Sequence, residues 1–209
     1  MFANPTNTAP TNVRGILQHL QVVTFPGNAL AANQFSGELR GYDVFAGGSG
    51  GNCVDLEHTA NPYRFYGLVA SGCMIGINMV HSRAEEFHGV SAFGNTIDVS
   101  LSGWNETSAY LLFDGAQFGP SDEENMYLDQ QNETVLCAAN CTFTKAWQSC
   151  PPTVSPTCAA IEIGPDLPSS WTLSETGQIV CQESGHLKCY GQPLSVSLSV
   201  SGDKVPGTG

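Results

Sequence analysis

The chain has 209 residues and a formal net charge of −12, and only 12% of its residues are charged, against about 25% in an average globular domain. Its 7 basic residues are scattered along the sequence, whereas phosphate backbones and anionic membrane surfaces are bound by clustered lysine and arginine. We therefore expect neither direct nucleic-acid binding nor membrane binding. The 23 glycines and 12 prolines indicate many short strands joined by turns.

In chain order, residues 1–12 are rich in Asn, Thr and Pro and are predicted to be a flexible arm. Residues 13–25 carry the first apolar run, with a strand expected over residues 22–25. Residues 29–60 are predicted to be rich in loops, because the glycine-rich insert at 47–51 opposes regular structure.

The most apolar segment of the chain is residues 61–83, which contains no charge between Phe65 and Val80. It is too short and too rich in glycine for a membrane-spanning helix. From Cys73 onward, its apolar residues alternate with a period of two, which is typical of a strand. We predict strands at about 63–70 and 73–81, with bends at Gly67 and at Ser71–Gly72.

Further alternating or apolar runs predict short strands in the second half of the chain, and no internal repeat is apparent. These runs lie at 95–102, 109–113, 135–147, 159–163, 171–173, 179–181 and 193–201. A total of eight to ten short strands favours an all-β fold, a single two-sheet β-sandwich of the jelly-roll type over residues 13–209.

The 8 cysteines are even in number, and six of them crowd the last third of the chain. This pattern predicts disulfides formed in an oxidising compartment, whereas buried free thiols are the alternative. No signal peptide is recognisable after Met1. Zinc binding is less favoured, because the cysteine gaps lack the two close pairs of a structural zinc site. The disulfide candidates are Cys137, Cys141, Cys150, Cys158, Cys181 and Cys189, and the last two could close a hairpin.

Two polar segments invite a metal hypothesis, and neither fits a known ligand spacing. His81, Glu85, Glu86 and His88 lie close together in sequence, but the paired histidines of cupin metalloenzymes are missing. Residues 122–124 are acidic, but they lack the spacing of a calcium-binding EF-hand loop. No Gly-x-Ser-x-Gly nucleophile elbow occurs either. We therefore expect no catalytic residue, no cofactor and no metal.

One part of the sequence resembles a known family. The segments Pro26–Gly–Asn, Gly41–Tyr–Asp and 61–77 are similar to small single jelly-roll viral capsid proteins, in which a tyrosine-rich segment leads into a core strand. The matching positions are Tyr63, Tyr66, Val69, Ser71–Gly72 and Ile75, with Ser and Gly in reversed order. The basic arm that such proteins use to package a genome is absent.

Together these features predict a structural, non-catalytic jelly-roll protein of a viral capsid or similar shell, such as a vertex component. Its partners would be copies of itself in a homo-oligomer, and other shell proteins. The alternative is an extracellular, disulfide-stabilised β-sandwich for binding or adhesion, lectin-like or a surface-filament subunit. The expected location is therefore the virion or the extracellular space.

Overall fold

The structure is a computed structural model in which strands account for most of the described chain. It describes residues 2–3, 14–23, 26–33, 38–48, 50–57, 63–81, 84–103, 109–130, 133–138, 141–145, 159–163, 170–174, 179–183, 187–191 and 195–201. Side chains are described as far as Tyr127, except those of a few residues at strand ends. From Leu128 onward the description covers strands and their pairing.

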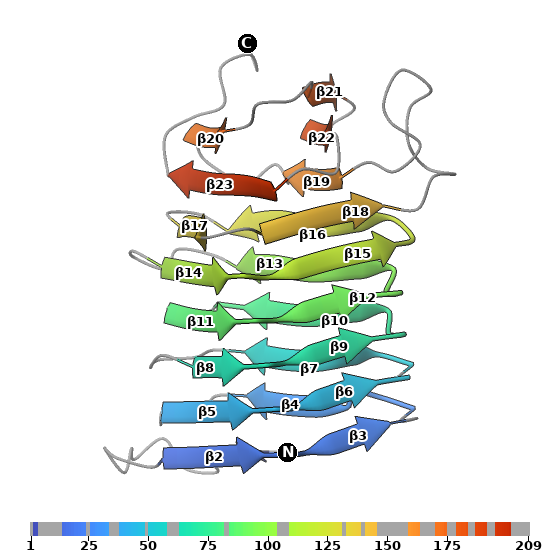
Figure 1. The fold of residues 1–209 in the computed structure, drawn as a ribbon, viewed down its shortest axis with the longest axis vertical. Helices are drawn as coiled ribbons and strands as arrows, with labels where there is room; N and C mark the ends of the chain where they lie inside the picture. Colours follow the sequence, from blue (N-terminus) through green and yellow to red (C-terminus); the bar gives the residue numbers. More distant parts are fainter. Residues whose placement is uncertain are drawn as a thin grey trace.

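The chain winds into a parallel β-solenoid in which each turn contributes three strands (Figure 1). The predicted jelly-roll sandwich is therefore wrong, and so is the fold that the capsid resemblance implies. Alternation shows which residues of a strand face the core, but it does not distinguish parallel from antiparallel neighbours. Parallel strands are usually joined by a helical crossover. In this solenoid, the other two strands of the turn lead the chain from one strand to its parallel neighbour.

Each of the three strand positions in a turn builds its own parallel ladder. The first ladder is β2 (Arg14–Gln18), β5 (Glu38–Tyr42), β8 (Tyr63–Tyr66), β11 (Ala84–His88), β14 (Ala109–Asp114) and β17 (Glu133–Ala138). The second is β3 (Gln21–Val23), β6 (Phe45–Gly47), β9 (Val69–Ser71), β12 (Ser91–Phe93), β15 (Gln117–Ser121) and β18 (Cys141–Lys145). The third is β1 (Phe2–Ala3), β4 (Leu30–Asn33), β7 (Asn52–Glu57), β10 (Ile75–Val80), β13 (Ile97–Gly103), β16 (Glu124–Gln130) and β19 (Ala159–Ile163).

Like side chains stack along the interior from one turn to the next. Phe65, Phe87 and Phe113 form a column, with ring centroids 5.5 and 5.1 Å apart. Opposite them, Val54, Ile77 and Val99 occupy one register on the third ladder. All six are fully buried, and each such side chain contributes roughly 1.5–3 kcal/mol when removed from water. The stacking of apolar residues between turns thus supplies the hydrophobic core.

In the five turns whose corner is described, the connection between the first and second strands is two residues long. Its first residue has a positive φ, between 49° and 72°, and its second is apolar and points inward. These pairs are His19–Leu20, Asp43–Val44, Gly67–Leu68, Gly89–Val90 and Gly115–Ala116. Glycine suits the positive φ best. The pairs recur every 22 to 26 positions, so the expectation of no internal repeat is wrong.

Several predicted strands are confirmed, and one predicted loop region is not. The bends at Gly67 and Gly72 are observed, with φ of 72° and 70°, and they divide the apolar segment into β8, β9 and β10. Residues 29–60 are not loop-rich, because they hold β4, β5, β6 and β7. Ser49 within the glycine-rich insert lies outside the described residues.

The last strands depart from the parallel coil. β23 (Ser195–Ser201) pairs antiparallel with β17, with β18 and with β20 (Ser170–Ser174). β22 (Leu187–Gly191) pairs antiparallel with β19 and with β21 (Ile179–Glu183). Antiparallel pairing is therefore confined to this end of the molecule (Figure 1). Of the predicted arm at 1–12, the structure describes residues 2 and 3, which pair with β4.

Among the described residues, no helix is long and apolar enough to cross a membrane.

Candidate functional site

Three arginines meet on the outer side of the first ladder. Arg14 lies in register with Glu38 on the next turn. Arg40 is likewise in register with Arg64, so the arginines occupy consecutive turns. We call the outer side of β2, β5 and β8 the arginine face. The scattered spacing of these residues in the sequence concealed this cluster, because they are separated by about one solenoid turn.

Glu38 is the centre of the arginine face, because all three guanidinium groups contact its carboxylate. Arg40 donates from Nε and Nη2 at 2.8 and 2.6 Å. Arg64 donates from Nη1 at 3.0 Å, and Arg14 Nε lies 3.3 Å from Oε2. The hydrogen bond from Arg40, together with the charges of the three arginines, lowers the pKa of Glu38. Glu38 therefore accepts these contacts as a carboxylate.

Arg64 also pairs with a second carboxylate, on β11. Its Nε and Nη2 donate to the two oxygens of Glu86 at 2.8 and 3.2 Å, which is a bidentate pair. His88 Nε2 lies 3.7 Å from the same carboxylate. The hydrogen bond from Arg64 lowers the pKa of Glu86. Glu86 thus offsets the charge of Arg64, whereas Arg14 and Arg40 share Glu38.

A second outward row of the first ladder is aromatic. Tyr42 and Tyr66 stack with centroids 5.1 Å apart and planes 9° apart. Tyr66 stacks on His88 at 4.9 Å and 7°, and His88 Nδ1 lies 3.2 Å from Asp114 Oδ2. Because each ring covers the face of the next, the row presents ring edges to solvent. Tyr66 lies between Tyr42 and His88 and therefore has no open ring face on which a sugar or base would stack.

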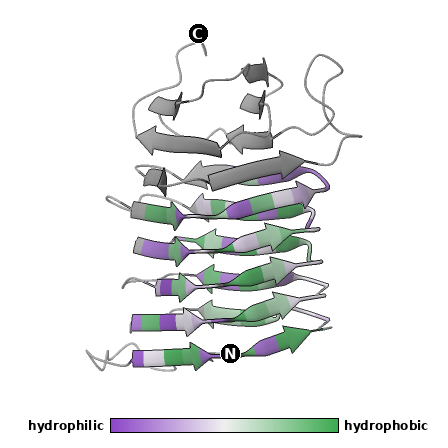
Figure 2. Cartoon of the chain, viewed as in Figure 1, coloured by the Kyte–Doolittle hydropathy of each residue, from purple (hydrophilic) through white to green (hydrophobic). Residues whose placement is uncertain are grey.

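The outer side of the second ladder has a different character, because the outward residues described on β3, β6, β9, β12 and β15 carry no charge. Val23 and Phe93 are 49% and 41% exposed, and Phe45 and Val69 are half-buried. The inward residues between them, such as Ala46, are small and buried. Figure 2 shows this side in green and pale colours along β6, β9 and β12, beside purple segments on β5, β8 and β11. The outward residues of what we call the uncharged face are Gln21, Val23, Phe45, Val69, Ser71, Ser91, Phe93 and Gln117.

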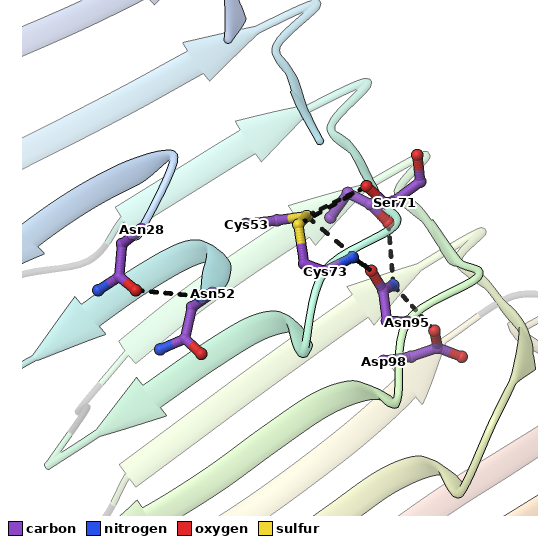
Figure 3. The surroundings of a disulfide bond; sticks show 8 residues. Asn28, Asn52, Cys53, Ser71, Cys73, Asn95 and Asp98 are labelled. Carbon is purple, nitrogen blue, oxygen red and sulfur yellow. Dashed lines mark hydrogen bonds between the residues drawn. A yellow bond between two sulfur atoms is a disulfide. The ribbon is translucent and has the colours of Figure 1, made fainter. Parts of the chain in front are cut away.

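A disulfide links two turns at the corner that follows the uncharged face. Cys53 on β7 is bonded to Cys73, which lies between β9 and β10 (Figure 3). Beside it, the buried Asn95 accepts a hydrogen bond from the Cys73 amide at 3.0 Å. Asn95 also donates to the Ala70 carbonyl at 3.1 Å. Three consecutive turns are therefore joined at this corner by one covalent bond and one buried amide.

The same corner buries a carboxyl group. Asp98 accepts from Asn95 Nδ2 at 3.0 Å and from Asn125 Nδ2 at 3.1 Å. Burial, opposed by these two hydrogen bonds, raises its pKa to about 7. The nearby charge of Asp122 acts in the same direction as burial. A group with this pKa changes its protonation near neutral pH.

The predicted disulfide candidates and the observed disulfide are different residues. The sequence does not indicate that Cys53 pairs with Cys73, because only the coiling of the chain brings the two residues together. The pairing of β21 with β22 places Cys181 opposite Cys189, and a bridge there stays a prediction. Cys137 and Cys141 lie on β17 and β18, and Cys150 and Cys158 lie outside the described residues.

The polar segments weighed as metal sites are divided by the fold. His81 precedes strand β11 and His88 ends it. The strand turns Glu85 into the core, whereas Glu86 and His88 point outward and lie 3.7 Å apart. Burial and the charge of Glu85 raise the pKa of Tyr63, its register partner. Asp122 and Glu123 are exposed at a corner, whereas Glu124 is buried. In the part of the chain that the structure describes, no three His, Cys, Asp or Glu residues are grouped to hold a metal ion.

No family model, no curated protein and no solved structure matches this chain.

Proposed function

We propose that the chain is a non-catalytic structural rod that associates with copies of itself, as a subunit of a virion shell or of a surface filament. The observation that carries this proposal is the uncharged face, which lies on a chain of net charge −12. Two such copies repel each other wherever their acidic surfaces meet. Contact over the uncharged face avoids direct juxtaposition of like charges while covering partly exposed Val and Phe side chains.

The size of this face determines what kind of association to expect. Five strands spaced about 4.8 Å apart, each roughly three residues long, cover on the order of 20 Å by 10 Å. A stable pairwise interface buries about 800 Å² on each partner. The uncharged face alone therefore supports weak pairing, which becomes strong only where many copies make the same contact.

The disulfide supports a location outside the reducing cytosol, since disulfides persist mainly in oxidising compartments. A covalent link between two turns would also help each subunit to keep its fold before it associates with another copy. Both considerations favour a shell or filament subunit that is exposed to the extracellular medium.

The proposal is tested by measuring the mass of the purified chain by light scattering over a rising concentration series. We expect the mass to increase with concentration. The double variant Val69→Glu/Phe93→Glu should stay monomeric, because it places acidic groups on the uncharged face. Ile16→Glu is the matched control, since Ile16 is 62% exposed on the arginine face, and it should associate like the wild type.

A wild-type chain that stays monomeric at every concentration, with its disulfide intact, would overturn the proposal. Equal association of the wild type and of the double variant would remove the uncharged face as the contact. Circular dichroism of each variant identifies any loss of association that is caused by unfolding.

A further inference from the structure

We propose that the arginine face is a binding site for an acidic polysaccharide, with Arg14 and Arg40 holding the carboxylates of its uronate units. The inference concerns a different face from the one proposed for self-association, so the two can fail separately. The grouping of arginines on one face is unexpected in so acidic a chain. The three described arginines all lie on one face, within three consecutive turns.

The balance of charge on this face leaves positive charge available. Glu38 is the one carboxylate that Arg14 and Arg40 contact through the hydrogen bonds and ion pairs given above, and it also accepts from Arg64. Arg64 has a further partner in Glu86. If the charge of Glu86 offsets that of Arg64, then Glu38 is the one carboxylate that remains to offset both Arg14 and Arg40. A carboxylate supplied by a ligand would balance this surplus and would gain charge-assisted hydrogen bonds.

The arginines with surplus charge are also the accessible ones. The side chains of Arg14 and Arg40 are 75% and 42% exposed, against 28% for Arg64. Ile16, which precedes Arg40 in the same register row, adds an exposed apolar surface for the C–H groups of a sugar ring. A planar guanidinium can bind a carboxylate through two parallel hydrogen bonds, so each arginine can select for this group.

The length of the site is limited by the carboxylates on the turns beyond β8. Glu86 on β11 and Asp114 on β14 point outward on the same ladder. They would repel an anionic chain that extended over them. The positive part of the face covers three strands, or roughly 10 Å along the solenoid axis. It therefore accommodates a short stretch of an acidic polymer.

The charge of the whole molecule favours a polysaccharide over a nucleic acid. A double-stranded nucleic acid carries one charge per about 1.7 Å, and its binding needs several lysine or arginine contacts to phosphates. A small surplus of positive charge on a chain of net charge −12 does not offset repulsion of so dense a charge. A uronate polymer carries at most one carboxylate per sugar, and this lower charge density suits the arginine face.

The test is a calorimetric titration of the full chain with trigalacturonate in about 20 mM salt. A neutral trisaccharide and a short duplex DNA are titrated in parallel. We expect binding to trigalacturonate alone. The variant Arg14→Gln/Arg40→Gln should reduce the affinity at least about tenfold, because it removes charge-assisted hydrogen bonds. Lys145→Gln is the matched control, since it removes one positive charge from β18 and should change the affinity less than about twofold.

Two further measurements guard against a variant that fails to fold. Arg14→Gln alone alters the most exposed of the three arginines and should weaken binding about threefold with an unchanged melting temperature. Arg40→Lys keeps the charge but removes the planar fork, so its affinity should fall between those of the wild type and the double variant.

Absence of binding to trigalacturonate at low salt, or equal affinity of the wild type and the double variant, would overturn the proposal. Tighter binding to the duplex DNA than to trigalacturonate would also overturn it, and would make the face a nucleic-acid site. Loss of self-association in the Val69→Glu/Phe93→Glu variant leaves this result untouched, because that variant retains all three arginines.

Discussion

The arginine face and the uncharged face are built by successive strands of the same turns, yet they carry opposite kinds of chemistry. On the first, the outward positions of β5, β8 and β11 carry arginine, glutamate or an aromatic ring, so neighbouring turns are joined by ion pairs and stacking. On the second, the described outward positions are apolar or carry an uncharged polar group, and the inward ones are mostly alanine. One coil can therefore present two surfaces of different chemistry, because the strands at each position of the turn share side chains of similar type.

Removal of the disulfide should have the largest effect on the protein, and it should affect the uncharged face more than the arginine face. The variant Cys53→Ser/Cys73→Ser should lower the free energy of unfolding by about 3 kcal/mol, because a loop of this size is no longer closed in the unfolded chain. The disulfide follows the uncharged face, so self-association should weaken more than trigalacturonate binding. Denaturant unfolding, light scattering and calorimetry measure the three quantities.

Wild-type protein treated with reductant should reproduce this variant, and reductant should have no further effect on the variant through this pair. If association and trigalacturonate binding fell by the same factor, the two faces could not be regarded as separate.

The buried carboxyl of Asp98, at the same corner, should make the free energy of unfolding depend on pH. Its pKa of about 7 in the folded chain exceeds the ordinary value of 3.8, so the folded chain holds this proton more tightly than the unfolded chain does. Its contribution to stability is complete below pH 4 and is lost as the pH rises through 7. Between pH 5 and pH 8 the loss should be about 2.5 kcal/mol.

Denaturant unfolding at several pH values measures this loss, and Asp98→Asn should flatten the profile, because an amide does not ionise. Asn95 and Asn125 donate to Asp98, and Asp122 is the charged group that acts on it. Asp122→Asn should therefore lower the apparent pKa slightly. An unchanged profile in Asp98→Asn would assign the pH dependence to other groups.

Salt should act on the two faces with opposite signs. Raising the salt concentration from about 20 to 200 mM should weaken trigalacturonate binding by roughly one order of magnitude, because the attraction is screened. The same change should strengthen self-association, because the repulsion between acidic copies is screened as well. Calorimetry and light scattering on one preparation give both trends, and two trends of the same sign would contradict the division of roles.

The smallest expected effect distinguishes ligand binding from a purely structural ion-pair cluster. Glu38→Gln removes the carboxylate that competes for the arginines, so trigalacturonate should bind about threefold more tightly. The melting temperature should fall, because the three arginines lose their shared partner. A variant that lost stability and also bound more weakly would show that the cluster serves only the fold.

The sequence predicts the strands well and their arrangement poorly, for a physical reason. The alternation in 73–81 and 193–201 predicts which residues face a core, and strands β10 and β23 lie there. Parallel pairing depends on residues a full turn apart, such as Ile77 and Val99, and no local pattern records it. The two-residue corners from Asp43–Val44 to Gly115–Ala116 were the readable signal, but their first position is aspartate in one corner and glycine in the next three.

The candidate site was missed for the same reason. Arg14, Arg40 and Arg64 become neighbours only when each turn closes, and so do Cys53 and Cys73. By contrast, the sparse charge of the chain and the prediction of disulfide chemistry both came from composition, which does not depend on how the strands pair.

The two-residue corners also govern where this chain tolerates a change of length. The first and second strands of a turn are always joined by two residues, as at Gly67–Leu68, whereas five residues separate β13 from β14 and two separate β16 from β17. Strands β11, β14 and β17 stay in register although the connections that precede them differ in length. A peptide grafted between Gly103 and Ala109 would therefore be displayed at a set height along the rod. The same peptide placed after Gly67 would interrupt the winding.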